Sequence, residues 1–190
     1  MKIDKKTTLA EFSVFQNIIK QEQIETLFER LKTRPVPSEI CGKKIPENFN
    51  LLTWAQFAEL QSLKGTDEDF FRPFEIILNL HREKLATCKI FDIFSFMLFV
   101  KNELENIAKL FNKIKYAPTP EEKQAGIDKL NFGTFGTLDW YARRMGFCDH
   151  AEAEKTPWIR IYKCLEIDSV TGKYEKRLRK IFDDKNKIKK

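Results

Sequence analysis

The sequence predicts an all-α fold, an irregular multi-helix bundle with an N-terminal helical arm and a basic C-terminal tail. Three observations lead to this prediction. Phe occurs 17 times whereas Gly and Pro occur seven times each, a balance that favours packed helices over turn-rich sheets. Apolar residues recur at three- and four-residue spacing along much of the chain, as they do on one face of a helix. Helix-capping signals stand directly before several of these stretches.

The first predicted element is a helix, or a pair of helices, that begins at a capping box. Thr8 and Glu11 have the spacing at which a hydroxyl and a carboxylate satisfy each other's free backbone donors. An apolar stripe follows as far as Leu31, and Pro35 ends the pattern.

Residues 33–50 are the only long breaker-rich stretch in the first 115 residues, with Pro35, Pro37, Gly42 and Pro46 among polar side chains. We interpret this stretch as a linker or an ordered arm. It divides the chain into an N-terminal helix and arm, a helical core domain and a basic tail, which span residues 1–50, 51–184 and 185–190.

The core domain opens with a second capping signal, Thr53 and Gln56, before a helix with an aromatic face. Asp67 can cap the next helix, which reaches about His81. Pro73 lies too far inside that helix for an undisturbed first turn, so we expect a bend or a late start.

Residues 90–115 form the most helix-like segment, and we expect it to be the central core helix. Thr119 and Pro120, followed by two acids, give the clearest helix start in the chain. Residues 131–136 predict a glycine-hinged turn, after which Thr137 caps a helix.

Thr156 and Pro157 repeat the signal of a cap followed by proline. Residues 168–172 predict a turn, and a last helix then begins near Tyr174. We expect its apolar face to dock on the core domain through Tyr174, Leu178, Ile181 and Phe182. The chain shows no sequence repeat of 20 to 50 residues.

A chain of 190 residues can bury a sizeable core as one domain without the help of a disulfide or a metal. The apolar tract at residues 90–100 is far shorter than the roughly 20 residues of a membrane span. The N-terminal residues do not resemble a signal peptide. We expect four reduced thiols in a protein that is not secreted, because no close pair occurs among Cys41, Cys88, Cys148 and Cys164.

The side-chain chemistry assigns no catalytic residue, no cofactor site and no metal site. His150 with Cys148 or Cys164, and His81 with Cys88, are the sets that could act as nucleophile and base or as ligands, but neither has paired ligand spacing. Ordinary surface histidines and core cysteines explain them better. We therefore expect a protein that is not an enzyme.

The net charge of +6 is concentrated at the C-terminus. Residues 173–190 carry nine basic and three acidic side chains of the totals of 34 and 28, so residues 1–172 carry 25 of each sign. This segment is a solvated end, a contact for nucleic acid or a contact for an acidic protein. The candidate contact residues are Lys176, Arg177, Arg179, Lys180, Lys185, Lys187, Lys189 and Lys190.

Four short patterns carry a resemblance to a known class of protein. They are L-T-W-x-Q-F from Leu52, A-G-I-x-x-L-x-x-F-G from Ala125, P-W-x-x-x-Y-x-x-L from Pro157 and Y-E-K-R-L from Tyr174. In this order they resemble small helical virion or tail-assembly proteins of tailed bacteriophages, including the crAss-like group.

The resemblance implies a non-enzymatic structural or assembly protein that contacts other phage proteins in the connector, vertex or tail region of the virion, or during tail assembly. It implies several copies, possible homo-oligomers, no membrane partner, and a location in the virion or the host cytoplasm. A nucleic-acid-binding regulator that uses the basic tail is the alternative.

Overall fold

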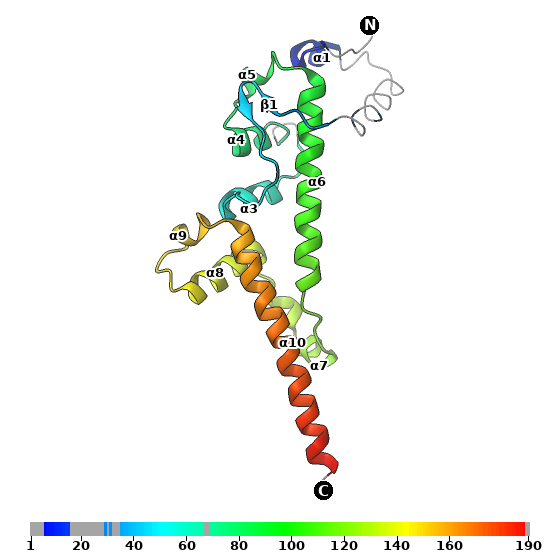
Figure 1. Cartoon of the computed structure of the whole chain (residues 1–190), viewed down its shortest axis with the longest axis vertical. Coiled ribbons are helices and arrows are strands. Elements are labelled where there is room, and N and C mark those ends of the chain that lie inside the picture. Colours follow the sequence, from blue (N-terminus) through cyan, green and yellow to red (C-terminus); the bar gives the residue numbers. More distant parts are fainter. Residues whose placement is uncertain (1–5, 16–28, 30, 32–34, 67–68, 189–190) are drawn as a thin grey trace. The chain divides into compact units, whose positions relative to one another are not determined.

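The computed structural model describes residues 6–15, 29, 31, 35–66 and 69–188 (Figure 1). In these residues the chain is mostly helical, with one two-stranded hairpin, which confirms the predicted all-α class. The later part of the first predicted helix and the cap at Asp67 lie outside the described residues. Within them, no helix combines the length and the apolarity that crossing a membrane requires.

Contacts between residues divide the chain into two compact units, and neither unit is continuous in sequence. Unit 1 consists of Met1–Phe49 and Glu59–Asn106, and unit 2 of Asn50–Ala58 and Ile107–Lys190. The grouping therefore differs from the division at residue 50 that the sequence suggested.

Unit 1 is built around the first part of one long helix. The elements that fall wholly or partly in it are α1 (Leu9–Phe15), β1 (Glu39–Ile40), β2 (Lys43–Lys44), the end of α3 (Trp54–Ser62), α4 (Arg72–Leu78), α5 (Arg82–Leu85) and the first part of α6 (Ile90–Ile114). Ile90, Ile93 and Phe96 recur at three-residue spacing on α6 and are fully buried. Phe74 of α4 packs on Phe96, with ring centroids 4.7 Å apart.

The stretch expected to be a linker or an arm is ordered from residue 35 onward. β1 and β2 pair antiparallel across a two-residue turn, and Cys41 and Gly42 both have positive φ, as a tight hairpin turn requires. Ile40, Ile45 and Phe49 are buried. Residues 39–49 are thus packed within unit 1.

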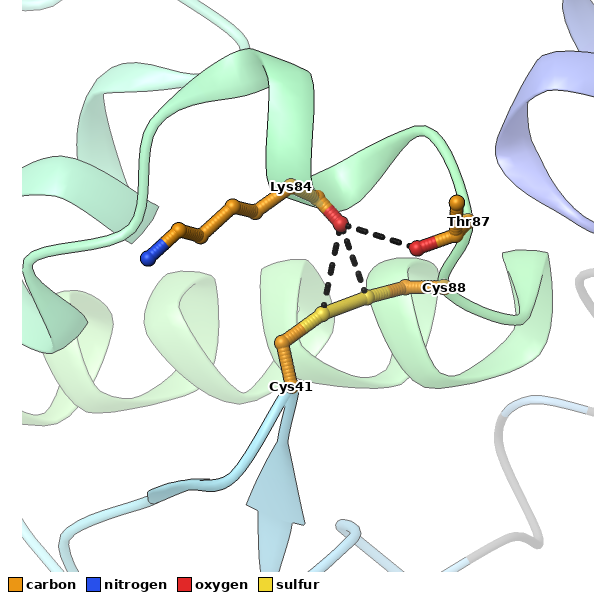
Figure 2. Close-up of a disulfide and its surroundings, with 4 residues drawn as sticks. All are labelled: Cys41, Lys84, Thr87 and Cys88. Atoms are coloured by element: carbon orange, nitrogen blue, oxygen red, sulfur yellow. Dashed lines mark hydrogen bonds between the residues drawn. A yellow bond between two sulfur atoms is a disulfide. The ribbon is translucent and has the colours of Figure 1, made fainter.

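The hairpin turn also overturns the expectation of four reduced thiols. Cys41 forms a disulfide with Cys88, which lies between α5 and α6 (Figure 2). Both sulfur atoms lie near the Lys84 carbonyl oxygen, at 3.4 and 3.5 Å, and the Thr87 hydroxyl donates a hydrogen bond to the same oxygen. A separation of 47 residues hides this pairing from any local pattern.

Unit 2 contains the start of α3 (Trp54–Ser62), the end of α6, and all later elements. These are α7 (Pro120–Gln124), the 3₁₀ helix η1 (Ile127–Leu130), α8 (Gly133–Met145), α9 (His150–Glu154) and α10 (Trp158–Ile188). Phe57, Phe111 and Trp158 form the centre of its core, with ring centroids 5.7 to 6.1 Å apart.

Each of the two long helices, α6 and α10, is joined at its start to a short capped helix. Thr8 and Glu11 form a reciprocal capping box at the start of the short helix α1, and Thr53 and Gln56 form one at the start of α3, as predicted. Thr8 lies in an antiparallel bridge with the residue before α6, and Thr53 in one with Pro157, the residue before α10. A short capped helix is therefore tied to the start of each long helix.

The same local structure therefore occurs twice in the chain. The two capped segments have only the pattern T-x-A-x-F in common, as T-L-A-E-F at residues 8–12 and T-W-A-Q-F at residues 53–57, which is too short to register as a sequence repeat. Main-chain hydrogen bonds flank both bridges, from Leu9 and Ile90 in unit 1 and from Trp54 and Trp158 in unit 2, at 2.8 to 3.0 Å.

Two predicted turns are wrong, because the helices run through them. α8 already begins at Gly133, so residues 133–136 are its first turn, and α10 continues without a break through residues 168–172. A single glycine in a helix costs only about 1 kcal/mol relative to alanine, and strong helix formers follow Gly172.

Candidate interaction surface on helix α10

Helix α10 has two apolar faces, one in each half. In its N-terminal half Trp158, Ile161 and Tyr162 are buried in the core of unit 2. In its C-terminal part, from residue 167 onward, Leu178 is half-buried and five large apolar side chains are each more than half exposed, namely Ile167, Val170, Tyr174, Ile181 and Phe182.

The two faces lie on opposite sides of the helix. Successive residues of an α-helix are rotated by about 100°, so residues 158 and 174 are about 160° apart around the axis. The apolar stripe therefore changes sides near residue 166, while the helix itself continues unbroken (Figure 1). A helix that only packed within its own unit would keep one apolar side.

The side that the C-terminal half of α10 turns toward its own unit is polar. The Ser169 hydroxyl donates a hydrogen bond to the Ile114 carbonyl oxygen, at 3.4 Å. One heptad later, Lys176 donates a hydrogen bond to the Tyr116 hydroxyl at 2.6 Å and lies 4.3 Å from the centre of that ring. The exposed apolar residues lie on the far side of the helix from these contacts.

A chain of polar contacts fixes the position of Lys176. The Tyr116 hydroxyl donates to the carboxylate of Glu122, and Glu122 also completes a capping box with Thr119 at the predicted start of α7. The hydrogen bond from Tyr116 and the one from the Thr119 backbone lower the pKa of Glu122, while the hydrogen bond with Tyr116 raises the pKa of Lys176. These contacts tie α10 to the start of α7 through residue 176.

A second anchor holds α10 to α8. Arg144 forms an ion pair with Asp168, and its guanidinium also lies 5.4 Å from the centre of the Trp140 ring. The carboxylate of Asp168 raises the pKa of Arg144. Beyond Lys176, the described part of the chain has no hydrogen bond or ring contact between α10 and another element.

Four of the predicted basic residues lie with exposed side chains on the part of α10 beyond Lys176. Arg177, Arg179, Lys180 and Lys185 are exposed, and Lys176 is exposed but engaged with Tyr116. Lys187 lies in the helix but its side chain is not among those described, and Lys189 and Lys190 lie outside the described residues. The helix reaches Ile188, so a separate tail from residue 185 is not what the chain forms there.

The expected docking of the last apolar face on the core domain is wrong. Tyr174, Ile181 and Phe182 are 51 to 56% exposed, and Leu178 is half-buried. The prediction assumed a turn at residues 168–172, which would have folded this face back. The spacing of the stripe was visible in the sequence, but the change of side appears only once the helix is known to be continuous.

The histidines weighed as catalytic or ligating residues lie in simple surface pairs. His150 Nε2 is 3.2 Å from Asp139 Oδ1, and this contact is the first cause of the lowered pKa of Asp139. His81 Nδ1 is 3.7 Å from Glu75 Oε1. Cys148 is exposed and Cys164 is half-buried. Across the described ranges, no group of three or more His, Cys, Asp or Glu side chains could hold a metal ion.

A smaller apolar region lies at the junction of η1 and α8. Leu130, Phe132 and Phe135 are 59 to 67% exposed. Unit 2 therefore exposes two apolar regions, this one and the outward face of α10, that the folded chain itself does not cover.

Comparison of the sequence with protein-family models and with curated proteins, and of the structure with solved structures, finds no match.

Proposed function

We propose that this chain is a non-enzymatic assembly protein of a tailed bacteriophage, which acts through protein–protein contacts in the virion or during tail assembly. The observation that carries the proposal is the outward apolar face of α10, defined as Ile167, Val170, Tyr174, Leu178, Ile181 and Phe182. The phage setting rests on the resemblance carried by the four sequence patterns.

The physics of an isolated helix supports an interaction role. Helices that lack tertiary packing are marginal in water even at favourable composition. From residue 171 to 186 the helix has only Gly172 and Leu178 partly covered. Burial of its apolar side on a partner would stabilise both the helix and the complex.

The experiment is mass spectrometry of purified virions and of assembly intermediates from a phage that encodes the chain. A structural component stays in the mature particle, whereas a tail-assembly chaperone appears only in intermediates. Absence from both preparations, with the protein expressed in the infected cell, would reject the proposal.

A nucleic-acid-binding regulator is the second candidate, because Arg177, Arg179 and Lys180 are exposed on one short stretch of helix. Its binding would depend strongly on salt, since phosphate contacts release counterions. Titration against duplex DNA at two salt concentrations tests it. Binding that stays at background in low salt would reject this candidate. The regulator ranks second because binding of nucleic acid gives no role to the apolar face of α10.

A further inference from the structure

We infer that the Cys41–Cys88 disulfide is a redox-sensitive clasp, which fixes the hairpin and helix α1 to the segment before α6 and which a thiol reductant opens. The inference about the bond itself depends only on contacts within unit 1. Its setting rests on the proposed function, because a protein of a phage particle passes from the reducing cytoplasm of the host to an oxidising exterior.

Cys88 contacts three other elements of unit 1. Its side chain is bonded to Cys41 in the hairpin turn, 47 residues earlier. Its carbonyl oxygen accepts a hydrogen bond from the Leu9 amide at the start of α1, at 2.9 Å. Its own amide donates to the Leu85 carbonyl oxygen at the end of α5, at 3.0 Å. The position of Cys88 therefore affects the hairpin, α1 and α5 together.

Two further main-chain hydrogen bonds join α1 to the same short segment. The Ala10 amide donates to the Ala86 carbonyl oxygen at 3.0 Å. The Ile90 amide donates to the Thr7 carbonyl oxygen at 2.9 Å. These bonds fall within two residues of the disulfide on either side. Motion of residues 86–90 after the disulfide opens therefore weakens the attachment of α1 at its start.

The disulfide is accessible from solvent on its hairpin side. Cys41 is exposed, as are the three residues that follow it in the hairpin, and Cys88 is half-buried (Figure 2). Thiol–disulfide exchange begins with the attack of a thiolate on a sulfur atom, so its rate depends on such access. Exposed disulfides are the labile ones, whereas buried structural disulfides resist reduction. The Cys41 sulfur is therefore the more accessible point of attack.

The backbone at Cys41 favours opening as well. This residue has a φ of 49°, in the left-handed region that a residue with a Cβ rarely adopts. In two-residue hairpin turns this position is usually Asn, Asp or Gly. Cleavage of the S–S bond allows the turn to relax, and release of this local strain favours the reduced state.

A dithiol opens the clasp in two exchange steps. One thiolate of the dithiol forms a bond with the Cys41 sulfur, the Cys41–Cys88 bond breaks, and the electron pair leaves on the Cys88 sulfur, which takes up a proton. The second thiolate then attacks the dithiol's own sulfur in the mixed disulfide and releases Cys41, which is protonated in turn. The dithiol has given two electrons and two protons and becomes a cyclic disulfide. A small-molecule disulfide reverses the exchange and is itself reduced to two thiols.

Labelling with a maleimide tests whether reductants reach the bond in the folded protein. The full chain is used in a Cys148→Ser and Cys164→Ser background, so that Cys41 and Cys88 are its two remaining cysteines. After treatment with oxidised glutathione neither should be labelled, and after dithiothreitol or excess reduced glutathione both should be. Labelling of both in the oxidised sample, or reduction that needs a denaturant, would overturn the inference.

Hydrogen–deuterium exchange of the same protein tests the effect on α1. Reduction should raise the exchange rates of the amides in residues 7–12 and 39–45 by about tenfold or more, because these segments lose a shared anchor. Residues 158–165, which lie in unit 2, should keep their rates. Equal increases in both units would show a loss of stability throughout the chain, and unchanged rates in residues 7–12 would show that the bond does not fix α1. Either result overturns the clasp.

The matched variant is Cys41→Asn, which removes the disulfide and keeps a residue suited to the left-handed turn. Its exchange in residues 7–12 should equal that of the reduced parent protein and should not respond to dithiothreitol. A response in this variant would assign the effect to the reductant itself and reject the clasp. The test on the parent protein needs no substitution at Cys41, so it remains decisive if this variant does not fold.

Alkylation of infected cells before lysis, and of purified virions, tests the setting. Cys41 and Cys88 should be alkylated in the cells and protected in the virions. Protection in both would show that the bond does not respond to the cytoplasm and would overturn the switch. Absence of the chain from virions and assembly intermediates would instead reject the proposed function, and it would leave the results on the purified chain unchanged.

Discussion

At the scale of single residues, Trp158 and Tyr174 show how position on one helix decides what an aromatic side chain does. Trp158 is 1% exposed and packs against the rings of Phe57, Phe111 and Tyr162. Tyr174 is 55% exposed on the opposite side of α10. The first side chain contributes to the core, and the second is available to a partner.

We predict that Trp158→Ala lowers the free energy of unfolding by about 3 to 5 kcal/mol, the usual cost of truncating a large buried aromatic residue. Tyr174→Ala should change it by about 0.5 kcal/mol or less in the monomer. Urea denaturation at a low protein concentration measures both. Similar losses for the two variants would contradict the assignment of Tyr174 to a free surface.

Aromatic residues at helical spacing are typical of a core, and they are buried where the helix packs in its own unit. Trp54, Tyr141, Trp158 and Tyr162 are buried, and Trp140 is half-buried. The same pattern failed from Tyr174 onward. Periodicity identifies an apolar face, but it does not show whether the residues that bury that face belong to the same chain.

At the scale of elements, the capping signals were reliable, the two glycine-containing turns predicted at residues 131–136 and 168–172 were wrong, and contacts between distant residues left no local signal. The capping boxes at Thr8 and Thr53 form as predicted, and the predicted helix start at Thr119 also forms a capping box, because each depends on residues three positions apart. The late start of α4 at Arg72 follows from Pro73, and Gly146 ends α8 in the left-handed conformation.

The disulfide and the outward exposure of the apolar face of α10 are the features of the fold and the site that the sequence did not reveal. Cys41 and Cys88 meet because a two-residue hairpin turn places one beside the segment that precedes α6, and neither position has a local signature. The basic residues near the C-terminus were visible in the sequence as a charge run, and their role as contact residues stays a prediction. Their placement on a continuous helix was not visible there.

We predict that reducing the Cys41–Cys88 disulfide destabilises unit 1. Closing a loop of 47 residues removes conformational freedom from the unfolded chain and contributes about 4 kcal/mol in the entropic model. Thermal unfolding followed with and without a reductant measures the difference. The Cys41→Ser variant is the control, because its melting temperature should not respond to reductant, whereas an identical response in both proteins would exclude the disulfide as the cause.

At the scale of the whole molecule, each of the two units is made of two separate stretches of the sequence. Asn50–Ala58 belongs to unit 2 although residues on both sides of it belong to unit 1. This short segment carries Trp54 and Phe57, two buried rings of the unit 2 core. The helices α3 and α6 therefore each contribute to both units.

We predict that a fragment of residues 1–106 melts cooperatively, since it contains all of unit 1. A fragment of residues 107–190 should lack a cooperative transition, because it is missing Trp54 and Phe57 and leaves the rings of Phe111 and Trp158 uncovered. Circular dichroism melts of both fragments provide the measurement. A cooperative melt of the second fragment would show that the α3 segment is dispensable for unit 2.

The membership of residues Asn50–Ala58 in unit 2 has a consequence for synthesis on the ribosome. Residues 50–58 emerge from the ribosome well before Trp158, whose ring packs against Phe57 in the folded chain. Unit 1 has all its residues once position 106 has left the exit tunnel, and folds around a nascent segment whose aromatic side chains have no cover yet. Throughout that interval Trp54 and Phe57 lack the Trp158 ring that packs beside them in the folded chain, and exposed apolar side chains of this kind favour misassociation. We expect slower translation of residues 107–158 to lengthen this exposure.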